Sequence, residues 1–377
     1  MGIYKTAPGF MVLLDGLRAV AVVAVILFHW TPEVKQTGLG GLGVQLFFVL
    51  SGYLITGILL EARAKAEMLG AGRLQIVKSF YARRFLRIFP LYYLVLISAA
   101  LLGSYNVQQY IGWHLGYLTN VVIYMRDSWI GEASHLWSLA VEEQFYLLWP
   151  FVILFTPRRY LTATCIGFIL LAPIFKLSCY YLGVGGSRLG VLPISSFQYL
   201  GAGALLALVE KSTRYRTDSY WRERFTSRIR LAGIVGLLTF AVLRFVPPFA
   251  AAGHVVAVTR EFALIALFVS LTMGAAIGYA GTAGRVLSSK PMVYLGQISY
   301  GLYLFHNFIP YFTHKLLLNF NLNAGLTPGV YWMLLVNAGV LLLVSSLSWR
   351  WFESRLNVYK GRFPYVRVGK AREAVMH

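Results

Sequence analysis

Residues 11–30 read MVLLDGLRAVAVVAVILFHW, an apolar run that contains Asp15, Arg18 and His29. An α-helix rises about 1.5 Å per residue, so a run of this length reaches across the roughly 30 Å hydrocarbon core of a bilayer. Similar runs recur along the chain, in which 58% of the residues are hydrophobic and 13% are charged. Soluble domains have about 25% charged residues, and membrane β-strands are shorter and alternate. The sequence therefore predicts an all-α integral membrane protein.

The apolar runs predict one membrane domain over residues 1–377, a bundle of about ten transmembrane helices. The stretch 110–124 is half apolar, which favours a re-entrant or interfacial helix over an eleventh span. The first run contains charged residues and no cleavage site, so we expect it to remain as a membrane helix. The expected spans are 11–30, 42–60, 82–102, 137–155, 160–182, 194–209, 231–247, 260–280, 293–318 and 330–350.

The basic residues predict how this bundle is oriented. The chain has 34 Lys and Arg against 14 Asp and Glu, a formal net charge of +20. With the N-terminus inside, basic residues from Lys5 to Arg372 crowd the inward segments, and the outward loops contain only Lys35, Arg126 and Arg188. Such loops stay in the cytoplasm and face anionic lipid, so both termini are expected there and no nucleic-acid partner is needed. Neither cysteine has a metal-ligand spacing, and no metal site is expected.

Ionisable residues inside the first span are candidates for function, because burying them in a membrane is costly. Arg18 and His29 are eleven residues apart, about three helical turns plus 20°, so both lie on one face. Asp15 and Arg18 are spaced to pair at i, i+3. The alternative is a plain ion pair with an interfacial histidine beside Trp30.

Two arginines near the start of the third expected span form a second candidate group. Residues 81–90 read YARRFLRIFP, in which Arg84 and Arg87 share a face. Clustered guanidinium groups suit phosphates, such as those of a CoA thioester. The alternative is an anchor of the positive-inside kind.

Polar residues in the fourth and ninth expected spans complete the candidates. Residues 135–146 read HLWSLAVEEQFY, and adjacent side chains point about 100° apart, so at most one of Glu142 and Glu143 faces a given partner. Residues 299–306 read SYGLYLFH, in which Tyr303 and His306 share a face. The candidate pocket residues are Ser51, Gly52, His135, Trp137, Ser138, Glu143, Ser299, Tyr300, Tyr303 and His306.

Together these segments resemble the acyltransferase-3 family of integral membrane O-acyltransferases, the type that O-acetylates polysaccharides, O-antigens and Nod factors. The motifs are spread over about 340 residues in the family's order, without room for the esterase-like domain fused to some members. The matching pieces are LDGLRAV at 14–20 with LFH at 27–29, GVQLFFVLSGYL at 43–54, RFLRIFP at 84–90, HLWSLAVEEQFY at 135–146, LGQISYGLYLFH at 295–306 and WFE at 351–353.

The resemblance implies an enzyme of the bacterial plasma (inner) membrane that moves an acyl group, usually acetyl, from cytoplasmic acyl-CoA to a carbohydrate hydroxyl. The acceptor would be an extracellular polysaccharide, an O-antigen or a lipid-linked saccharide, with no permanently bound cofactor. His29 matches the family's catalytic histidine and Arg18 its helix partner, while Arg84 and Arg87 match the arginines assigned to the donor.

Our hypothesis from these residues is that His29 acts as general base, since a neutral imidazole suits that role near neutral pH. We expect Glu142 to orient His29, and Arg18 either to stabilise the thioester oxygen or to hold Asp15. An acyl-histidine intermediate remains open. Two rival hypotheses are a transporter or flippase of a lipid-linked sugar or acyl group, and a non-catalytic subunit of a polysaccharide assembly complex.

Overall fold

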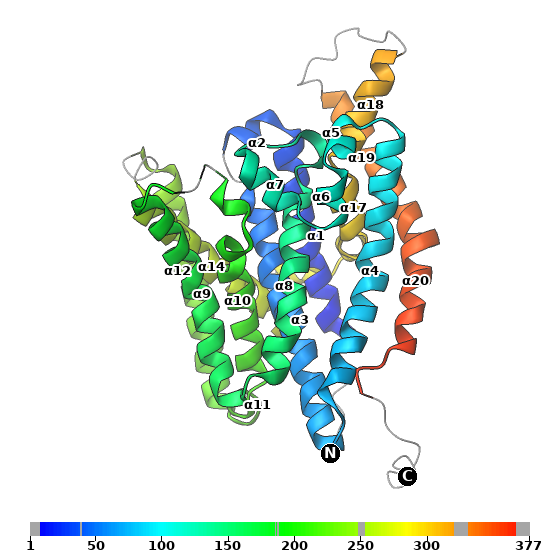
Figure 1. Ribbon diagram of the computed structural model, residues 1–377. Coiled ribbons are helices and arrows are strands. Elements are labelled where there is room, and N and C mark those ends of the chain that lie inside the picture. The colour runs from blue at the N-terminus through cyan, green and yellow to red at the C-terminus, as the bar shows by residue number, and fades with distance from the viewer. Residues whose placement is uncertain are drawn as a thin grey trace.

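The computed structural model describes residues 8–37, 40–184, 186, 188–247, 253–319 and 331–366. Within these ranges the chain forms helices and the turns between them, and no strand. The long helices stand side by side as a bundle (Figure 1). They are α1 (Pro8–Trp30), α3 (Gly41–Leu69), α4 (Arg73–Leu101), α8 (Leu136–Phe155), α9 (Arg158–Tyr181), α10 (Pro193–Glu210), α12 (Ser219–Phe245), α14 (His254–Ile277) and α19 (Tyr331–Ser348).

Shorter helices join the long ones or cover the ends of the bundle. They are α2 (Pro32–Gln36), α5 (Tyr105–Gln109), α6 (Ile111–Leu115), α7 (Thr119–Arg126), α11 (Thr213–Thr217), α15 (Gly281–Leu287), α16 (Lys290–Gln297), α17 (Ser299–Phe305), α18 (Phe308–Asn319) and α20 (Ser354–Val358). Single turns form 3-10 helices at η1 (Gly131–Ala133), η2 (Leu189–Val191) and η4 (Tyr359–Arg362), and a π-helix at η3 (Trp349–Glu353).

The all-helical membrane class predicted from the sequence is confirmed. Among the described residues, eight helical segments are long and apolar enough to cross a membrane. The helix α10, where the sixth span was expected, is not one of the eight. The count of about ten spans and the placement of the termini remain predictions.

The ninth expected span, 293–318, is wrong as a continuous helix. The structure divides this stretch into α16, α17 and α18, with breaks at Ile298 and at residues 306–307. Pro310 has no N–H to donate to the carbonyl of His306, and its ring crowds that carbonyl, so the helix ends there. The indole Nε1 of Trp30 donates to the freed His306 carbonyl instead, at 2.8 Å. The break thereby ties α17 to the end of α1.

One further expectation about helix bounds is corrected, and the preference for a non-spanning segment at 110–124 agrees with the structure. The helix α4 begins at Arg73 rather than near residue 82, so Arg84 and Arg87 lie about 16 and 21 Å from its start instead of at its entrance. The stretch 110–124 forms the short helices α6 and α7 at the upper end of the bundle, so it is not an eleventh span (Figure 1).

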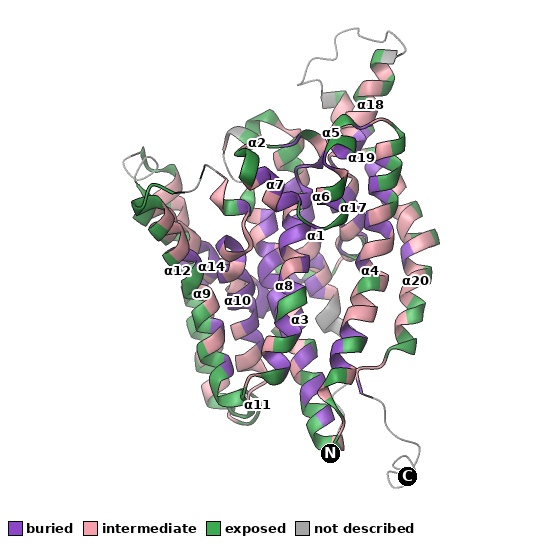
Figure 2. Ribbon diagram, viewed as in Figure 1, coloured by how far each residue is buried: buried purple, intermediate pink, exposed green. Residues whose placement is uncertain are grey.

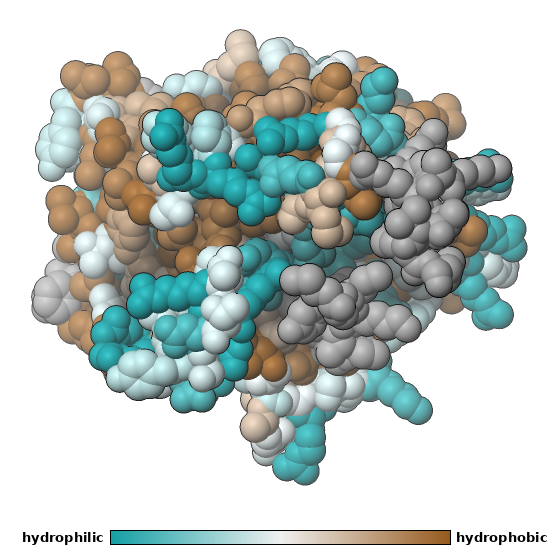
Figure 3. Space-filling model, turned by 90° about the horizontal axis from the view of Figure 1, so that it is seen from below, coloured by the Kyte–Doolittle hydropathy of each residue, from teal (hydrophilic) through white to brown (hydrophobic). Residues whose placement is uncertain are grey.

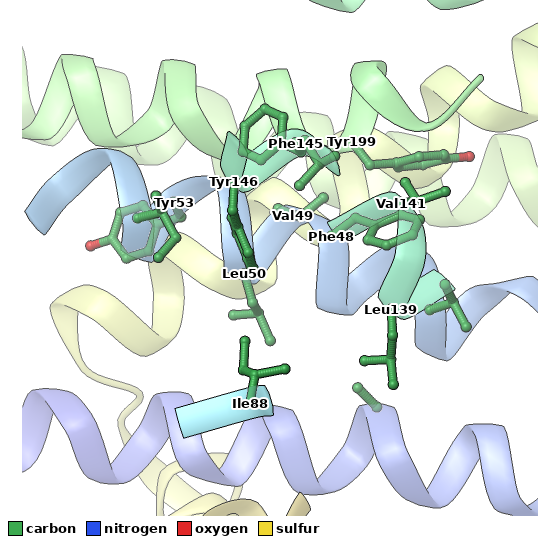
Figure 4. Close-up of a cluster of buried hydrophobic side chains, with 14 of the residues drawn as sticks. Phe48, Val49, Leu50, Tyr53, Ile88, Leu139, Val141, Phe145, Tyr146 and Tyr199 are labelled. Carbon is green, nitrogen blue, oxygen red and sulfur yellow. The ribbon is translucent and has the colours of Figure 1, made fainter. Parts of the chain in front are cut away.

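Close packing between central helices produces the core. A Cβ atom on Gly52 would lie 2.0 Å from the carbonyl oxygen of Leu200, and one on Gly203 would lie 2.0 Å from that of Val49, so α3 and α10 touch backbone to backbone. Buried residues concentrate on the central helices, and exposed residues on the outer faces (Figure 2). Side chains of α3 and α8 interleave inside the bundle, with Ile88 of α4 beside them (Figure 4). This core fixes the walls of the cavities described below.

One end of the bundle is marked by basic residues. The helix α11, with Arg214 and Arg216, lies at the lower end, where hydrophilic residues form broad patches (Figures 1 and 3). The helices α2 and α7 lie at the upper end. We call the lower end the basic end. Lys5, Arg367, Lys370 and Arg372, which the sequence also placed inside, lie outside the described residues.

Candidate functional site

Two adjoining cavities form the candidate site. The first, which we call the arginine cavity, has a volume of about 220 Å³ and is lined by polar side chains that include Arg18, Arg84 and Arg87. The second, the histidine cavity, has a volume of about 490 Å³ and contains His29. Two residues, Val44 and Tyr303, line both cavities, so the cavities adjoin at this pair.

The helix α1 contributes to both cavities. Arg18 lines the arginine cavity and His29 the histidine cavity, about 16 Å apart along the helix axis. Asp15 does not line either cavity; its Oδ1 lies 3.4 Å from Nη1 of Arg18. The eleven-residue spacing that puts both side chains on one helix face therefore sets one residue in each cavity.

The ring of His29 is open to the histidine cavity. It contacts the edge of Phe28, with ring centroids 5.2 Å apart, and the ring of His306, at 5.0 Å. Neither ring nitrogen has a hydrogen-bond partner among the described residues. An imidazole nitrogen without a partner keeps its lone pair available to accept a proton from a bound molecule.

His306 and His135 lie behind His29 in a row of three rings. The rings of His306 and His135 are 4.8 Å apart, and His306 Nδ1 faces the Tyr303 carbonyl while its Nε2 has no partner among the described residues. His135 Nδ1 lies 2.9 Å from the Glu132 carbonyl, and Nε2 lies 3.1 Å from a second carbonyl. Across the described part of the chain, no group of three His, Cys, Asp or Glu residues has metal-binding geometry. Neighbouring rings in the row meet at a tilted angle (56°) and edge to face (72°).

The arginine cavity contains two guanidinium groups, those of Arg84 and Arg87, that form no ion pair with a described residue. Arg84 lies over the Tyr146 ring, 4.6 Å from its centroid. Arg87 interacts electrostatically with Arg18, Arg84 and the buried carboxylate of Glu353. Neither Arg84 nor Arg87 has a hydrogen bond or ion pair to any residue that the structure describes. Their N–H groups are therefore free for a ligand.

Glu142 and Glu143 face different surroundings. Glu142 lines the arginine cavity and accepts hydrogen bonds from the hydroxyls of Ser51 and, at 3.0 Å, Tyr146. Glu143 is buried and interacts electrostatically with Arg84 and nearby tyrosines. The structure does not bring Glu142 to His29: its hydrogen-bond partners, Ser51 and Tyr146, line the arginine cavity, so a role in orienting His29 gains no geometric support.

The junction between the cavities is built by hydroxyl groups. Tyr303 OH is 2.5 Å from Ser138 Oγ and donates to the His135 carbonyl at 3.0 Å. Ser299 and Tyr300 line the arginine cavity, where Ser299 Oγ has no partner among the described residues.

Some sequence candidates fall elsewhere, and the sequence argument missed others. Gly52 packs against α10 and lines neither cavity. Trp137 lines the histidine cavity as expected of a pocket residue. Several lining residues of the histidine cavity were not proposed from the sequence, among them Lys35, Trp129 and Arg188. The sequence did single out two of them: Lys35 and Arg188 are two of the three basic residues in the loops expected to face outward.

These features define a helical membrane protein with two adjoining cavities, one lined by arginines and one by a histidine. A family model described as an acyltransferase domain, acyltransferase-3, matches residues 12–349, and the chain belongs to this membrane acyltransferase family. The resemblance identified from the motifs is thereby confirmed. No solved structure matches the chain.

Two relatives are named as O-acetyltransferases. The chain is 28% identical to a peptidoglycan O-acetyltransferase, OatA, of Listeria monocytogenes over 92% of its own length and 57% of the relative's. It is 27% identical to an O-acetyltransferase, OatA, of Staphylococcus aureus over 80% of its own length and 50% of the relative's. The chain thus spans about half the length of these curated relatives.

Proposed function

We propose that this protein transfers an acyl group, acetyl in the first instance, from acyl-CoA to a hydroxyl of a carbohydrate. The observation that carries the proposal is that the two cavities adjoin, with Val44 and Tyr303 lining both. A donor with several phosphates suits the unpaired arginines on one side of this junction, and a hydroxyl to be deprotonated suits the free imidazole of His29 on the other side. A transferase needs its acyl donor and its acceptor hydroxyl close to one another.

The arginine cavity binds the donor in this proposal. Arg84 and Arg87 donate charge-assisted hydrogen bonds to phosphate oxygens, which relieves the repulsion between these cations. The acyl end of the thioester then extends past Tyr303 toward His29. Because the arginines lie about three and four turns into α4, the donor enters the bundle from the basic end rather than resting on its surface.

His29 is the general base of the reaction. Its free ring nitrogen takes the proton of the acceptor hydroxyl while that oxygen attacks the thioester carbonyl carbon. The new C–O ester bond forms, the C–S bond breaks, and the CoA thiolate leaves and takes up the proton from the imidazolium. The competing route, in which His29 itself is acylated first, is distinguished by labelled acetyl on the protein in the absence of acceptor.

The experiment compares wild-type protein with His29→Ala, purified in nanodiscs, for binding of acetyl-CoA and release of free CoA with a panel of saccharides. A matched control is His314→Ala, since His314 is exposed on α18 and lines neither cavity. We expect donor binding in all three proteins and CoA release in all but His29→Ala. Full CoA release by a folded His29→Ala protein would refute the role of His29.

Absence of acetyl-CoA binding to folded wild-type protein would favour the transporter or flippase hypothesis instead. The acyl-CoA donor, a location in the bacterial plasma membrane, and work alongside polysaccharide assembly proteins are parts of this proposal. The relatives' names support acetyl as the group transferred, because both proteins are named as O-acetyltransferases.

A further inference from the structure

The charge of the histidine cavity bears on which acceptors it binds. Lys35 and Arg188 line this cavity, and no Asp or Glu is among the described residues that line it. The nearby carboxylate of Asp127 accepts a hydrogen bond from the backbone N–H of Arg188 at 3.1 Å and lies outside the lining. A hollow lined by one sign of charge concentrates ligands of the other sign.

Arg188 is held in place without being neutralised. Its guanidinium lies over the ring of Trp129, 4.8 Å from the centroid, which fixes the plane of the charged group. Its Nε is buried and has no hydrogen-bond partner among the described residues. Buried donors are nearly always paired in proteins, so one that is unpaired beside a cavity marks a place for a ligand acceptor atom.

The rest of the lining suits a sugar next to an anion. Trp129 and Trp137 offer flat apolar surfaces, and Asn307 offers an amide, the combination of aromatic walls and few polar groups that is typical of small-molecule sites. Lys35 is close enough to His29 to interact electrostatically with it. An anion bound at Lys35 therefore lies near the ring that deprotonates the hydroxyl.

The geometry points to an acceptor that carries a negative charge, a phosphate or a carboxylate, on or beside the sugar that is acylated. This inference rests on the proposed acyltransferase function and adds the chemical class of the acceptor. Arg188 and Lys35 bind the anion, the two tryptophans hold the sugar, and the hydroxyl is placed at His29.

The test measures binding to the full-length protein in nanodiscs of three probes with the same neutral core. They are N,N′-diacetylchitobiose, its analogue with one carboxylate in place of a primary hydroxyl, and the disaccharide linked through a diphosphate to farnesol. We expect each anionic probe to bind at least about tenfold more tightly than the neutral one, the factor for one charge-assisted hydrogen bond. Tighter binding of only the farnesyl probe would place the charge on a lipid carrier, and tighter binding of only the carboxylate would place it on the sugar.

Charge-neutral variants test the residues. Arg188→Gln and Lys35→Gln should each remove most of the preference for anionic probes and leave acetyl-CoA binding unchanged. The matched control is Arg126→Gln, because Arg126 lies over Tyr110 at the end of α7 and lines neither cavity. The inference is overturned if the wild-type protein binds no anionic probe or binds all three probes alike. It is also overturned if Arg126→Gln loses the preference for anionic probes as much as Arg188→Gln and Lys35→Gln do.

Failure of this inference is separable from failure of the proposed function. His29-dependent transfer of acetyl to the neutral disaccharide, with no advantage for the charged probes, would retain the transferase and reject the anionic acceptor. Preferential binding of anionic probes without any acetyl transfer would reject the transferase and leave a site for anionic saccharides.

Discussion

Replacing Arg87 with Gln tests whether this arginine binds the donor or stabilises the fold. Arg87 forms no hydrogen bond or ion pair with a described residue. It interacts electrostatically with Arg18 and Arg84 and with the carboxyl groups of Asp15 and Glu353, so its removal relieves repulsion as well as attraction and costs the fold little. A hydrogen bond to a charged group contributes about 1.5–3 kcal/mol. Loss of one phosphate contact should therefore raise the KM for acetyl-CoA by roughly 10- to 150-fold. The melting temperature should stay the same or rise.

Arg63 provides the opposite case and the matched control. It is 3% exposed, and its guanidinium donates to the carbonyls of Ile153 and Thr156, at 2.6 and 2.8 Å, and to Glu67 at 2.9 Å. Replacing Arg63 with Gln should leave buried carbonyls unpaired, at about 1–3 kcal/mol each, and lower the melting temperature by several degrees. The KM for acetyl-CoA should not change.

The assay for this pair is CoA release over a range of acetyl-CoA concentrations, together with thermal unfolding of the same preparations in nanodiscs. The reasoning about unpaired arginines is refuted if Arg87→Gln keeps the wild-type KM. It is equally refuted if Arg87→Gln melts as low as Arg63→Gln, because that would show that Arg87 holds the fold together.

The remaining predictions concern packing, a membrane ion pair and pH. Gly52→Ala should destabilise the protein by about 1–3 kcal/mol in thermal unfolding, because the added Cβ would meet the Leu200 carbonyl; wild-type stability would contradict the α3–α10 contact. Lys176→Met should lower stability by a few kcal/mol, because it removes the ammonium group 2.6 Å from Glu261 and leaves that carboxylate with only the Gln198 amide. Recovery of stability in the double variant with Glu261→Met would verify the pair, and no recovery would contradict it. Burial lowers the pKa of His114 to about 4, so its neutral form is favoured in the fold; stability should fall as pH drops from about 6.5 toward 4, and less steeply in His114→Gln. An identical pH dependence in the two proteins would show that His114 is not held neutral.

The sequence predicted the helices best where apolar runs are continuous. The bounds of α1, α8 and α9 agree with the expected spans within about three residues, because hydrophobic length alone decides them. The sequence prediction failed over 293–318. There Pro310, near the start of α18, interrupts the helix at His306, and Trp30 donates to the carbonyl that the proline frees. The proline is visible in the sequence, but a partner 276 residues away is not.

The sequence predicted many residues of the candidate site, but not which of them line the same cavity. The helical period places Arg18 and His29 on one face, and the structure gives each a cavity on that helix. No spacing rule relates Glu142 to Ser51, which lies on another helix, so the sequence assigned this carboxylate to His29 instead. Arg188 was missed because a loop has no periodicity from which the direction of a side chain could be inferred.

The most direct test asks whether acetyl passes from a donor on one side of the membrane, through the adjoining cavities, to an acceptor on the other side. It uses sealed proteoliposomes with the protein in one orientation, [¹⁴C]acetyl-CoA on the side of the basic end and a saccharide acceptor on the other side. We predict that the ¹⁴C label appears on the acceptor, and that neither His29→Ala nor donor supplied only on the acceptor side gives labelled product. Labelled acceptor in the His29→Ala liposomes, or none in wild-type liposomes that bind acetyl-CoA, would contradict the account.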